Sequence, residues 1–216
     1  QQLTVRPFFC ASIHNESLAK KTSGADTKIR FKDDKKNHRL AVYNALFSIE
    51  FDKSNGQIIR YDVDGNAMLG NQGTIKPNFW RAVTDNDMGA GLQRKMKVWR
   101  NPAVNLVSIE FNKGKKTPKN APVEEKPCVI ATYDMPDVNA KLTMTYAFCE
   151  DGSVEVAEKM TVDHAKKMPE MFRFGVVMQL PKSMDRSTYY GRGPIENYVD
   201  RKESQNIGIY TQTADE

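Results

Sequence analysis

Hydrophobic and polar residues alternate along most of this chain, with the period of two that is typical of half-buried β-strands. The clearest early examples are residues 28–32, 39–44 and 46–52. Later segments of the same character are "VNLVSIEFN", "CVIATYDM", "AKLTMTYAFCE", "SVEVAEKMTVD", "FRFGVVMQL" and "STYYGRG". These segments are rich in β-branched and aromatic residues and are bounded by Gly, Pro, Asp or Asn. The pattern predicts an all-β protein, a large antiparallel β-sandwich.

Two short turns separate early strands and predict a meander. Asn55-Gly56 and Asp64-Gly65 are pairs that tolerate the positive φ angles of tight hairpins. The second pair lies in "DVDGN", which is similar to the start of a calcium-binding loop. The closing Glu of a twelve-residue loop would fall at Gly73, so a hairpin turn is the better interpretation. Helix is expected only around residues 92–99, with a helical turn at 195–198.

Composition and charge narrow the class of protein without identifying it. The 216 residues are enough for one large domain. Of these residues 39% are hydrophobic, and no apolar run approaches the roughly 18 residues that a membrane-spanning helix needs. The net charge of +5 arises from 32 basic and 27 acidic residues that are spread along the chain. The densest basic run, "NKGKKTPKN", has no aromatic residues on which bases could stack, so it is interpreted as a solvated loop. Neither a nucleic acid nor a membrane is expected as a partner.

The potential metal ligands are scattered. The histidines lie far apart without a shared strand or helical turn, and the cysteines are odd in number without CxxC spacing. These residues are His14, His38, His164, Cys10, Cys128 and Cys149. We therefore predict no metal site in this chain and no disulfide framework.

A first dense cluster of polar residues is "PNFWRAVTDNDMGAG", residues 77–91. Asp85 and Asp87 are two positions apart, so on an extended chain both carboxylates would point to one face, as a cation site or an acid/base pair requires. Alternatively, Asp and Asn side chains accept hydrogen bonds from nearby backbone amides and stabilise an irregular turn. The second interpretation is favoured. Trp80, at the end of an apolar strand, is expected in the core.

The second dense cluster is "YYGRGPIENYVDRKESQNIGIY", residues 189–210. Arg192 stands between two glycines, and several acidic residues follow it. These residue types suit a buried arginine–carboxylate network that pins a loop, because the two groups form parallel hydrogen bonds. A ligand contact is the alternative. Gly-Arg-Gly lacks the spacing of the known phosphate-binding loops.

Together, the two clusters resemble the paired signatures of the small-chain domain of glycoside hydrolase family 2 β-galactosidases. The family pattern reads about FxRAPxDND-G and, later, GxGPxENYxDR. The first signature is matched by Arg81, Ala82, Asp85, Asn86, Asp87 and Gly89, and the second by Gly191, Gly193, Pro194, Glu196, Asn197, Tyr198, Asp200 and Arg201. Val83 replaces the usual proline. The resemblance covers about residues 28–216.

The resemblance implies a supersandwich similar to that of galactose mutarotase, in an enzyme that hydrolyses terminal β-D-galactosides with retention. The two catalytic glutamates of such enzymes lie on a TIM barrel, which would precede residue 1. No catalytic residue is therefore assigned in this chain, and the matched polar residues are assigned a structural role. The segment Gly89, Ala90 and Gly91 begins a loop that resembles one that closes toward bound sugar, and glycines suit such movement.

The resemblance also implies the domain organisation and the partners. Residues 1–27 are expected to be the tail of a preceding immunoglobulin-like domain with a linker, and residues 28–216 a small-chain sandwich that is incomplete at its C-terminus. The missing strands would leave a sheet edge exposed. The expected partners are the barrel and linker domains of the same polypeptide, a galactoside, and further copies in a homo-oligomer.

No cofactor is expected in this chain, since any Mg or Na of the full-length enzyme would bind at sites outside it. The compartment stays open between bacterial cytoplasm and periplasm. The family's sugar-stacking tryptophan lies beyond residue 216, so neither Trp80 nor Trp99 takes that role. An autonomous carbohydrate-binding sandwich remains the alternative. A mutarotase-like epimerase would need a catalytic His and Glu on a concave face, and the scattered histidines count against it.

Overall fold

The chain divides into a larger and a smaller compact unit. The computed structural model describes residues 3–5, 26–114, 126–163, 167–199 and 201–215. The units are Gln1–Gln179 and Leu180–Glu216. Residues 6–25 lie outside the described residues, so the assignment of residues 1–27 to a preceding domain stays a prediction.

One sheet of the larger unit is an antiparallel meander in the order β2-β3-β4-β5-β6. Its strands are β2 (Arg30–Asp34), β3 (Arg39–Tyr43), β4 (Phe47–Asp52), β5 (Gln57–Val63) and β6 (Asn66–Ala67). The two predicted tight turns are present, because Gly56 has a φ of 70° and Asp64 and Gly65 have φ angles of 49° and 76°. These left-handed conformations are those that Gly and Asp adopt at least cost.

The second sheet of this unit has the order β1-β11-β10-β9-β8 and is also antiparallel. Its strands are β1 (Leu3–Val5), β8 (Asn105–Asn112), β9 (Cys128–Met135), β10 (Ala140–Phe148) and β11 (Val154–Val162). Side chains of β9 and β10 alternate between buried and more exposed positions. The period of two in the sequence therefore corresponds to one face of the sheet that packs inward.

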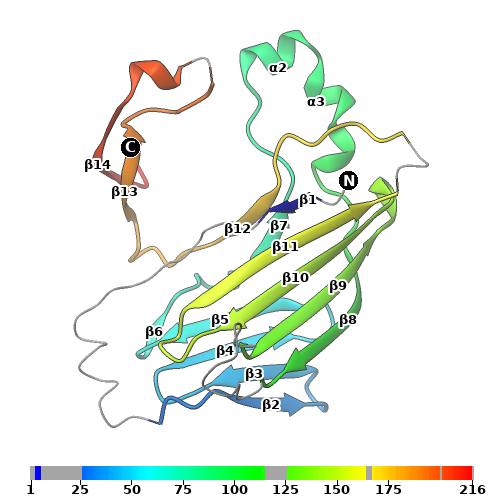
Figure 1. Ribbon diagram of the computed structural model, residues 1–216, viewed down its shortest axis with the longest axis vertical. Coiled ribbons are helices and arrows are strands. Elements are labelled where there is room, and N and C mark those ends of the chain that lie inside the picture. Colours follow the sequence, from blue (N-terminus) through cyan, green and yellow to red (C-terminus); the bar gives the residue numbers. More distant parts are fainter. Residues whose placement is uncertain (1–2, 6–25, 115–125, 164–166, 200, 216) are drawn as a thin grey trace, which may run out of the picture. The chain divides into compact units, whose positions relative to one another are not determined.

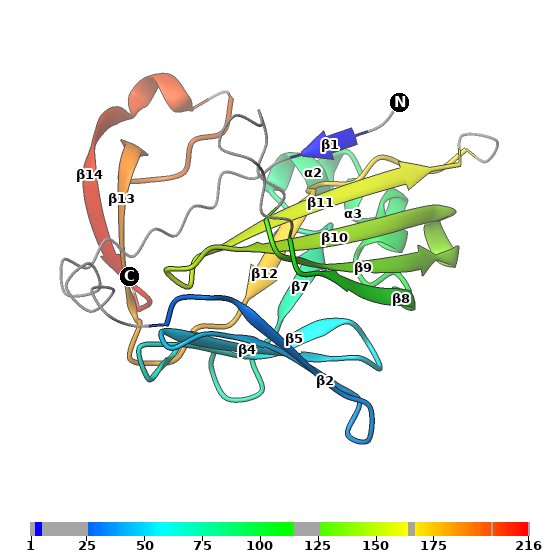
Figure 2. The same ribbon diagram turned by 60° about the horizontal axis from the view of Figure 1, so that its bottom comes forward.

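The two sheets pack face to face and enclose the hydrophobic core (Figure 1; Figure 2). Phe51 of β4 contacts Tyr146 and Phe148 of β10 edge to face, with ring centroids 5.2 Å and 6.3 Å apart. The Tyr61 hydroxyl of β5 donates to the Gly152 carbonyl at 2.7 Å, which ties the meander to the turn between β10 and β11. The predicted all-β antiparallel sandwich is confirmed.

Two short strands and several short helices of the larger unit position the first polar cluster. They are β7 (Ile75–Asn78), β12 (Gly175–Met178), α2 (Asp85–Gly89), α3 (Leu92–Lys95), η1 (Lys97–Trp99) and η2 (Pro136–Val138). The helix predicted around residues 92–99 is confirmed as α3 followed by the 3₁₀ turn η1. The predicted strand "FRFGVVMQL" is shorter than expected, since only its centre pairs with β7. None of the described helices is long and apolar enough to cross a membrane.

The smaller unit contains a hairpin of β13 (Arg186–Gly193) and β14 (Asn206–Thr213), with the 3₁₀ turn η3 (Lys202–Ser204) in its loop. The helical turn predicted at residues 195–198 is wrong. The Tyr198 carbonyl accepts hydrogen bonds from the Arg201 and Lys202 amides, at 2.8 Å and 2.9 Å, so the chain turns after residue 198 rather than before it.

Candidate functional site

The first polar cluster forms a capped corner at the start of α2. Thr84 is the N-cap residue, and its Oγ1 accepts the Asp87 amide at 3.3 Å while Asp87 Oδ2 accepts the Thr84 amide at 2.8 Å. This reciprocal pair is a capping box that satisfies two backbone donors at the helix start. The Thr-x-x-Asp spacing was readable in the sequence, yet we assigned no role to Thr84.

A short-range ion pair closes the same corner. Arg81 donates from Nη1 to Asp87 Oδ2 at 2.6 Å and from Nη2 to Asp87 Oδ1 at 3.3 Å. The guanidinium also lies 4.8 Å from the centre of the Phe172 ring, a cation–π contact. The hydrogen bonds from Arg81, followed by that from the Thr84 amide, lower the pKa of Asp87 to about 2. Asp87 is therefore a fixed carboxylate with structural partners.

The prediction that Asp85 and Asp87 share one face of an extended chain is wrong. Both residues belong to α2, where side chains two positions apart diverge by about 200°. Asp87 is buried, whereas Asp85 and Asn86 are exposed. The alternative interpretation, in which the polar residues stabilise an irregular turn, is confirmed for Asp87. Among the described residues, no group of three His, Cys, Asp or Glu side chains is placed to hold a metal ion.

Of the candidate loop residues, Gly89 is the last residue of α2, and Ala90 and Gly91 connect that helix to α3, so the segment is not a long irregular loop. Gly91 has a φ of 69°, a left-handed conformation that favours glycine. Gly89 is different, because a Cβ built there would meet nothing within 4 Å. The structure thus requires glycine at position 91 for its backbone, while the assignment of the segment to substrate binding stays a prediction.

Two aromatic residues anchor this region in the core. Trp99 is only 2% exposed, its ring lies 5.7 Å from that of Phe79, and its Nε1 donates to the Pro169 carbonyl at 2.7 Å. Trp80, which we expected in the core, is half-buried and meets the Phe172 ring edge to face at 4.8 Å. Phe79 takes the inward position because neighbouring residues of an extended segment point to opposite sides.

The second polar cluster organises the loop of the β13–β14 hairpin. Arg192 Nη1 donates to the Lys202 and Gln205 carbonyls, at 3.1 Å each, and the Arg192 carbonyl accepts from the Asn197 side chain at 2.8 Å. Arg201 pairs instead with Glu196 in this loop, at 2.8 Å and with both side chains exposed. Among the residues that the structure describes, Arg192 therefore binds backbone carbonyls and does not form the predicted buried network with a carboxylate.

The other matched residues of this loop fix the chain at its bend. The Gly193–Pro194 peptide bond is cis, and the Pro194 carbonyl accepts from the Gln212 side chain at 3.0 Å. A Cβ at Gly193 would lie 2.5 Å from the Tyr189 hydroxyl, so only glycine fits there. Gly191 has no such constraint, with its nearest neighbour 3.8 Å from a built Cβ. Asp200 lies outside the described residues.

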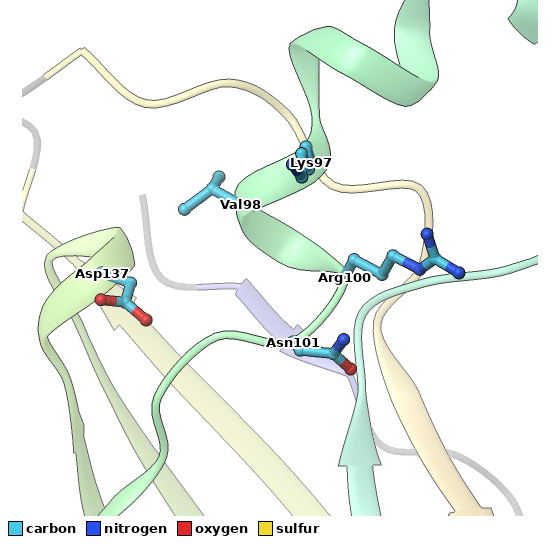
Figure 3. A pocket seen from close by; sticks show the side chains of 5 residues that line it. All are labelled: Lys97, Val98, Arg100, Asn101 and Asp137. Atoms are coloured by element: carbon cyan, nitrogen blue, oxygen red, sulfur yellow. The ribbon is translucent and has the colours of Figure 1, made fainter.

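An open hollow of about 510 Å³ lies beside η1 and η2, apart from the capped corner. Its lining residues are Lys97, Val98, Arg100, Asn101 and Asp137 (Figure 3). Asp137 Oδ2 accepts the Ala103 amide at 2.8 Å, and Figure 3 shows the Arg100 side chain pointing away from Asp137. The charged groups of the hollow do not converge on one point, so it is not an obvious reaction centre.

The larger unit is an antiparallel β-sandwich, and residues of each signature form hydrogen bonds that hold a turn of the chain. The chain belongs to the β-galactosidase small-chain family, because the model of the beta galactosidase small chain matches residues 43–216. The resemblance inferred from the two signatures is thereby confirmed.

Comparison with curated proteins finds β-galactosidases from several bacteria. The β-galactosidase of Priestia megaterium (strain DSM 319 / IMG 1521) is 30% identical over 177 residues, which cover 82% of this chain and 16% of the relative. That of Clostridium acetobutylicum is 27% identical over 81% of this chain and 18% of the relative. That of Lactobacillus delbrueckii subsp. bulgaricus is 29% identical over 178 residues, which cover 80% of this chain and 16% of the relative. The chain thus spans less than a fifth of the length of each of these relatives.

Proposed function

We propose that this chain is a non-catalytic part of a β-galactosidase, and that the intact polypeptide hydrolyses terminal β-D-galactosides. The observation that carries the proposal is the match of residues 43–216 to the small-chain family, supported by relatives named as β-galactosidases. In the intact enzyme, a glycoside hydrolase of family 2, two glutamates of the remaining polypeptide would supply the retaining mechanism.

The surroundings of Asp87 and Glu196 support a non-catalytic role for this chain. A general acid or base is most effective when its pKa lies near the working pH. Asp87 has a pKa of about 2 and is held by Arg81 and Thr84, so it is poorly suited to proton transfer. Glu196 forms an exposed ion pair with Arg201. Both carboxylates maintain the shape of their corners.

We further propose that Gly89, Ala90 and Gly91 border the mouth of the active site in the intact enzyme. Gly89 and Ala90 are exposed, and the segment leaves a corner that is fixed by the ion pair and the capping box. A mobile segment on a rigid base is a common arrangement for loops that close over a substrate. The partners are then the other domains of the polypeptide, the galactoside, and further copies in a homo-oligomer. Any Mg or Na would bind outside this chain.

The test compares this chain with the intact polypeptide. Nitrophenyl β-galactoside should be hydrolysed by the intact polypeptide and not by the chain alone. Calorimetry of the chain with lactose or galactose should detect nothing tighter than millimolar binding. A micromolar dissociation constant would instead favour the alternative, an autonomous carbohydrate-binding sandwich, and hydrolysis by the chain alone would refute a non-catalytic role.

The loop has a matched pair of variants in the intact polypeptide. Gly91→Ala and Gly65→Ala each place a side chain on a left-handed residue, with φ angles of 69° and 76° and little nearby to clash. Both should lower stability by about 1 kcal/mol. Only Gly91→Ala should change kcat/KM. If hydrolysis is equally unaffected in both variants, the loop proposal fails while the β-galactosidase proposal stands.

A further inference from the structure

Glu158 has a buried carboxyl group and lies outside both signatures. It lies on β11, its side chain is only 1% exposed, and both carboxyl oxygens lack a hydrogen-bond partner among the described residues. In the register of the sheet it is opposite Met144 of β10 and Val5 of β1. Buried polar groups in proteins are nearly always hydrogen-bonded, so an unpartnered carboxyl needs an explanation.

The surroundings of Glu158 favour the neutral form of the group. On β10 the titratable neighbour is Tyr146, which is itself buried and stays protonated because burial and then the nearby Tyr133 and Glu158 raise its pKa. The three residues of β1 have no titratable side chains, and no cation pairs with Glu158 among the described residues. Burial raises the pKa of the Glu158 carboxyl to about 8. The group is therefore protonated at neutral pH and ionises in mildly alkaline solution.

The carboxylate would be strongly destabilised in this position, because a buried charge without a partner loses its hydration. Of the two strands that pair with β11, β1 is the less extensively paired. On the other side, β10 pairs with β11 along the whole of Val154–Val162, whereas β1 covers only Glu158–Met160. A strand held by so few backbone hydrogen bonds opens at a much lower free-energy cost than a long central one.

We propose that Glu158 is a pH-sensitive latch for β1. Strand β1 stays paired with β11 while the Glu158 carboxyl is protonated, and it leaves the sheet edge when the carboxyl loses its proton. The uncovered edge of β11 then presents unpaired backbone donors and acceptors to solvent. The latch couples proton concentration to the exposure of one strand edge, without unfolding the sandwich.

Native-state hydrogen exchange by mass spectrometry tests the latch in this chain. Amides in Leu3–Val5 and Glu158–Met160 should lose about tenfold or more of their protection between about pH 6 and about pH 9.5, after correction for intrinsic exchange. Glu158→Gln, which is uncharged at both values, should show no such loss. Glu155→Gln is the matched control on the same strand, because Glu155 is exposed and pairs with Lys126; it should behave as wild type.

Two results would overturn the latch. One is protection of β1 that stays constant through about pH 9.5 in the wild type, or that falls equally in Glu158→Gln. The other is an opening free energy of β1 that equals that of β3 and β4 at every pH, since β1 would then be exposed only by global unfolding rather than by release of one strand. The wild-type titration decides the matter by itself if Glu158→Gln does not fold, because protection of β1 must then fall as the pH rises toward about 8, level off above it, and stay below the protection of β3 and β4 throughout.

Discussion

Replacing Trp99 with phenylalanine isolates the hydrogen bond that anchors the segment after α3. The indole of Trp99 is 2% exposed, and its Nε1 donates to the Pro169 carbonyl at 2.7 Å. Phenylalanine keeps an aromatic ring next to Phe79 but has no donor. The variant thus leaves the carbonyl without its partner and a small volume unfilled, while most of the packing remains.

The expected loss follows from these two changes. A hydrogen bond of this kind contributes about 1 kcal/mol, and more when the abandoned acceptor stays buried. The missing part of the indole is worth roughly one or two methylene groups, at about 0.8 kcal/mol each. We therefore expect Trp99→Phe to lower the free energy of unfolding by about 2 kcal/mol, equivalent to roughly 4–8 °C in Tm for a chain of this size.

Urea denaturation followed by circular dichroism measures this loss, and Trp80→Phe is the matched control. The chain has two tryptophans, so each variant keeps one as a fluorescence reporter. Trp80 is half-buried, and its edge-to-face contact with Phe172 can be kept by phenylalanine, so the control should lose less than about 1 kcal/mol. Equal losses in the two variants would refute the anchoring role of the Trp99 hydrogen bond.

Three further sets of variants probe other features. Folding raises the pKa of Glu158 from 4.5 to about 8, so between these values the folded state keeps a proton that the unfolded chain has lost. Wild-type stability should therefore fall by about 1.4 kcal/mol per pH unit from about pH 5 to about pH 8 and then level off. Glu158→Gln should flatten this profile in urea titrations, and an unchanged slope would contradict the assignment. Thr84→Ala removes the N-cap acceptor and should cost about 1 kcal/mol, whereas Thr84→Ser should recover most of it. Gly56→Ala adds a Cβ 2.5 Å from the Tyr133 hydroxyl at a φ of 70° and should cost about 2 kcal/mol or more in the same urea titrations. Gly89→Ala, where a Cβ meets open space, should be nearly neutral.

The strands were predictable because one face of each sheet is buried. In β9 and β10 the buried positions recur at every second residue. Because buried positions favour apolar side chains, apolar and polar residues alternate in the sequence of these strands. The tight turns were predictable for a different reason. The backbone at Gly56 and at Asp64-Gly65 needs left-handed φ angles that few residues adopt, so the turn geometry restricts the amino acids.

The partners of the polar residues were harder to predict. The sequence of the second signature offered Arg192 several carboxylates, but the guanidinium binds the Lys202 and Gln205 carbonyls, and Glu196 pairs with Arg201 instead. All of these acceptors are chemically suitable for arginine. Which one is reached depends on the path of the hairpin loop, and this path follows from backbone geometry that residue types and spacing do not specify.

Glu158 shows that a departure from the pattern can be as informative as the pattern. Val154, Val156, Glu158, Met160 and Val162 occupy the same phase of the β11 strand, so the alternation that predicts the strand also predicts that this carboxyl faces inward with its apolar neighbours. We used the alternation to place the strand and overlooked its charged member. A charged residue in the buried phase of a strand must find a partner, lose its charge or destabilise the fold. Because no described residue provides a partner, loss of the charge is the outcome that the structure supports, and this makes the stability of β11 sensitive to pH.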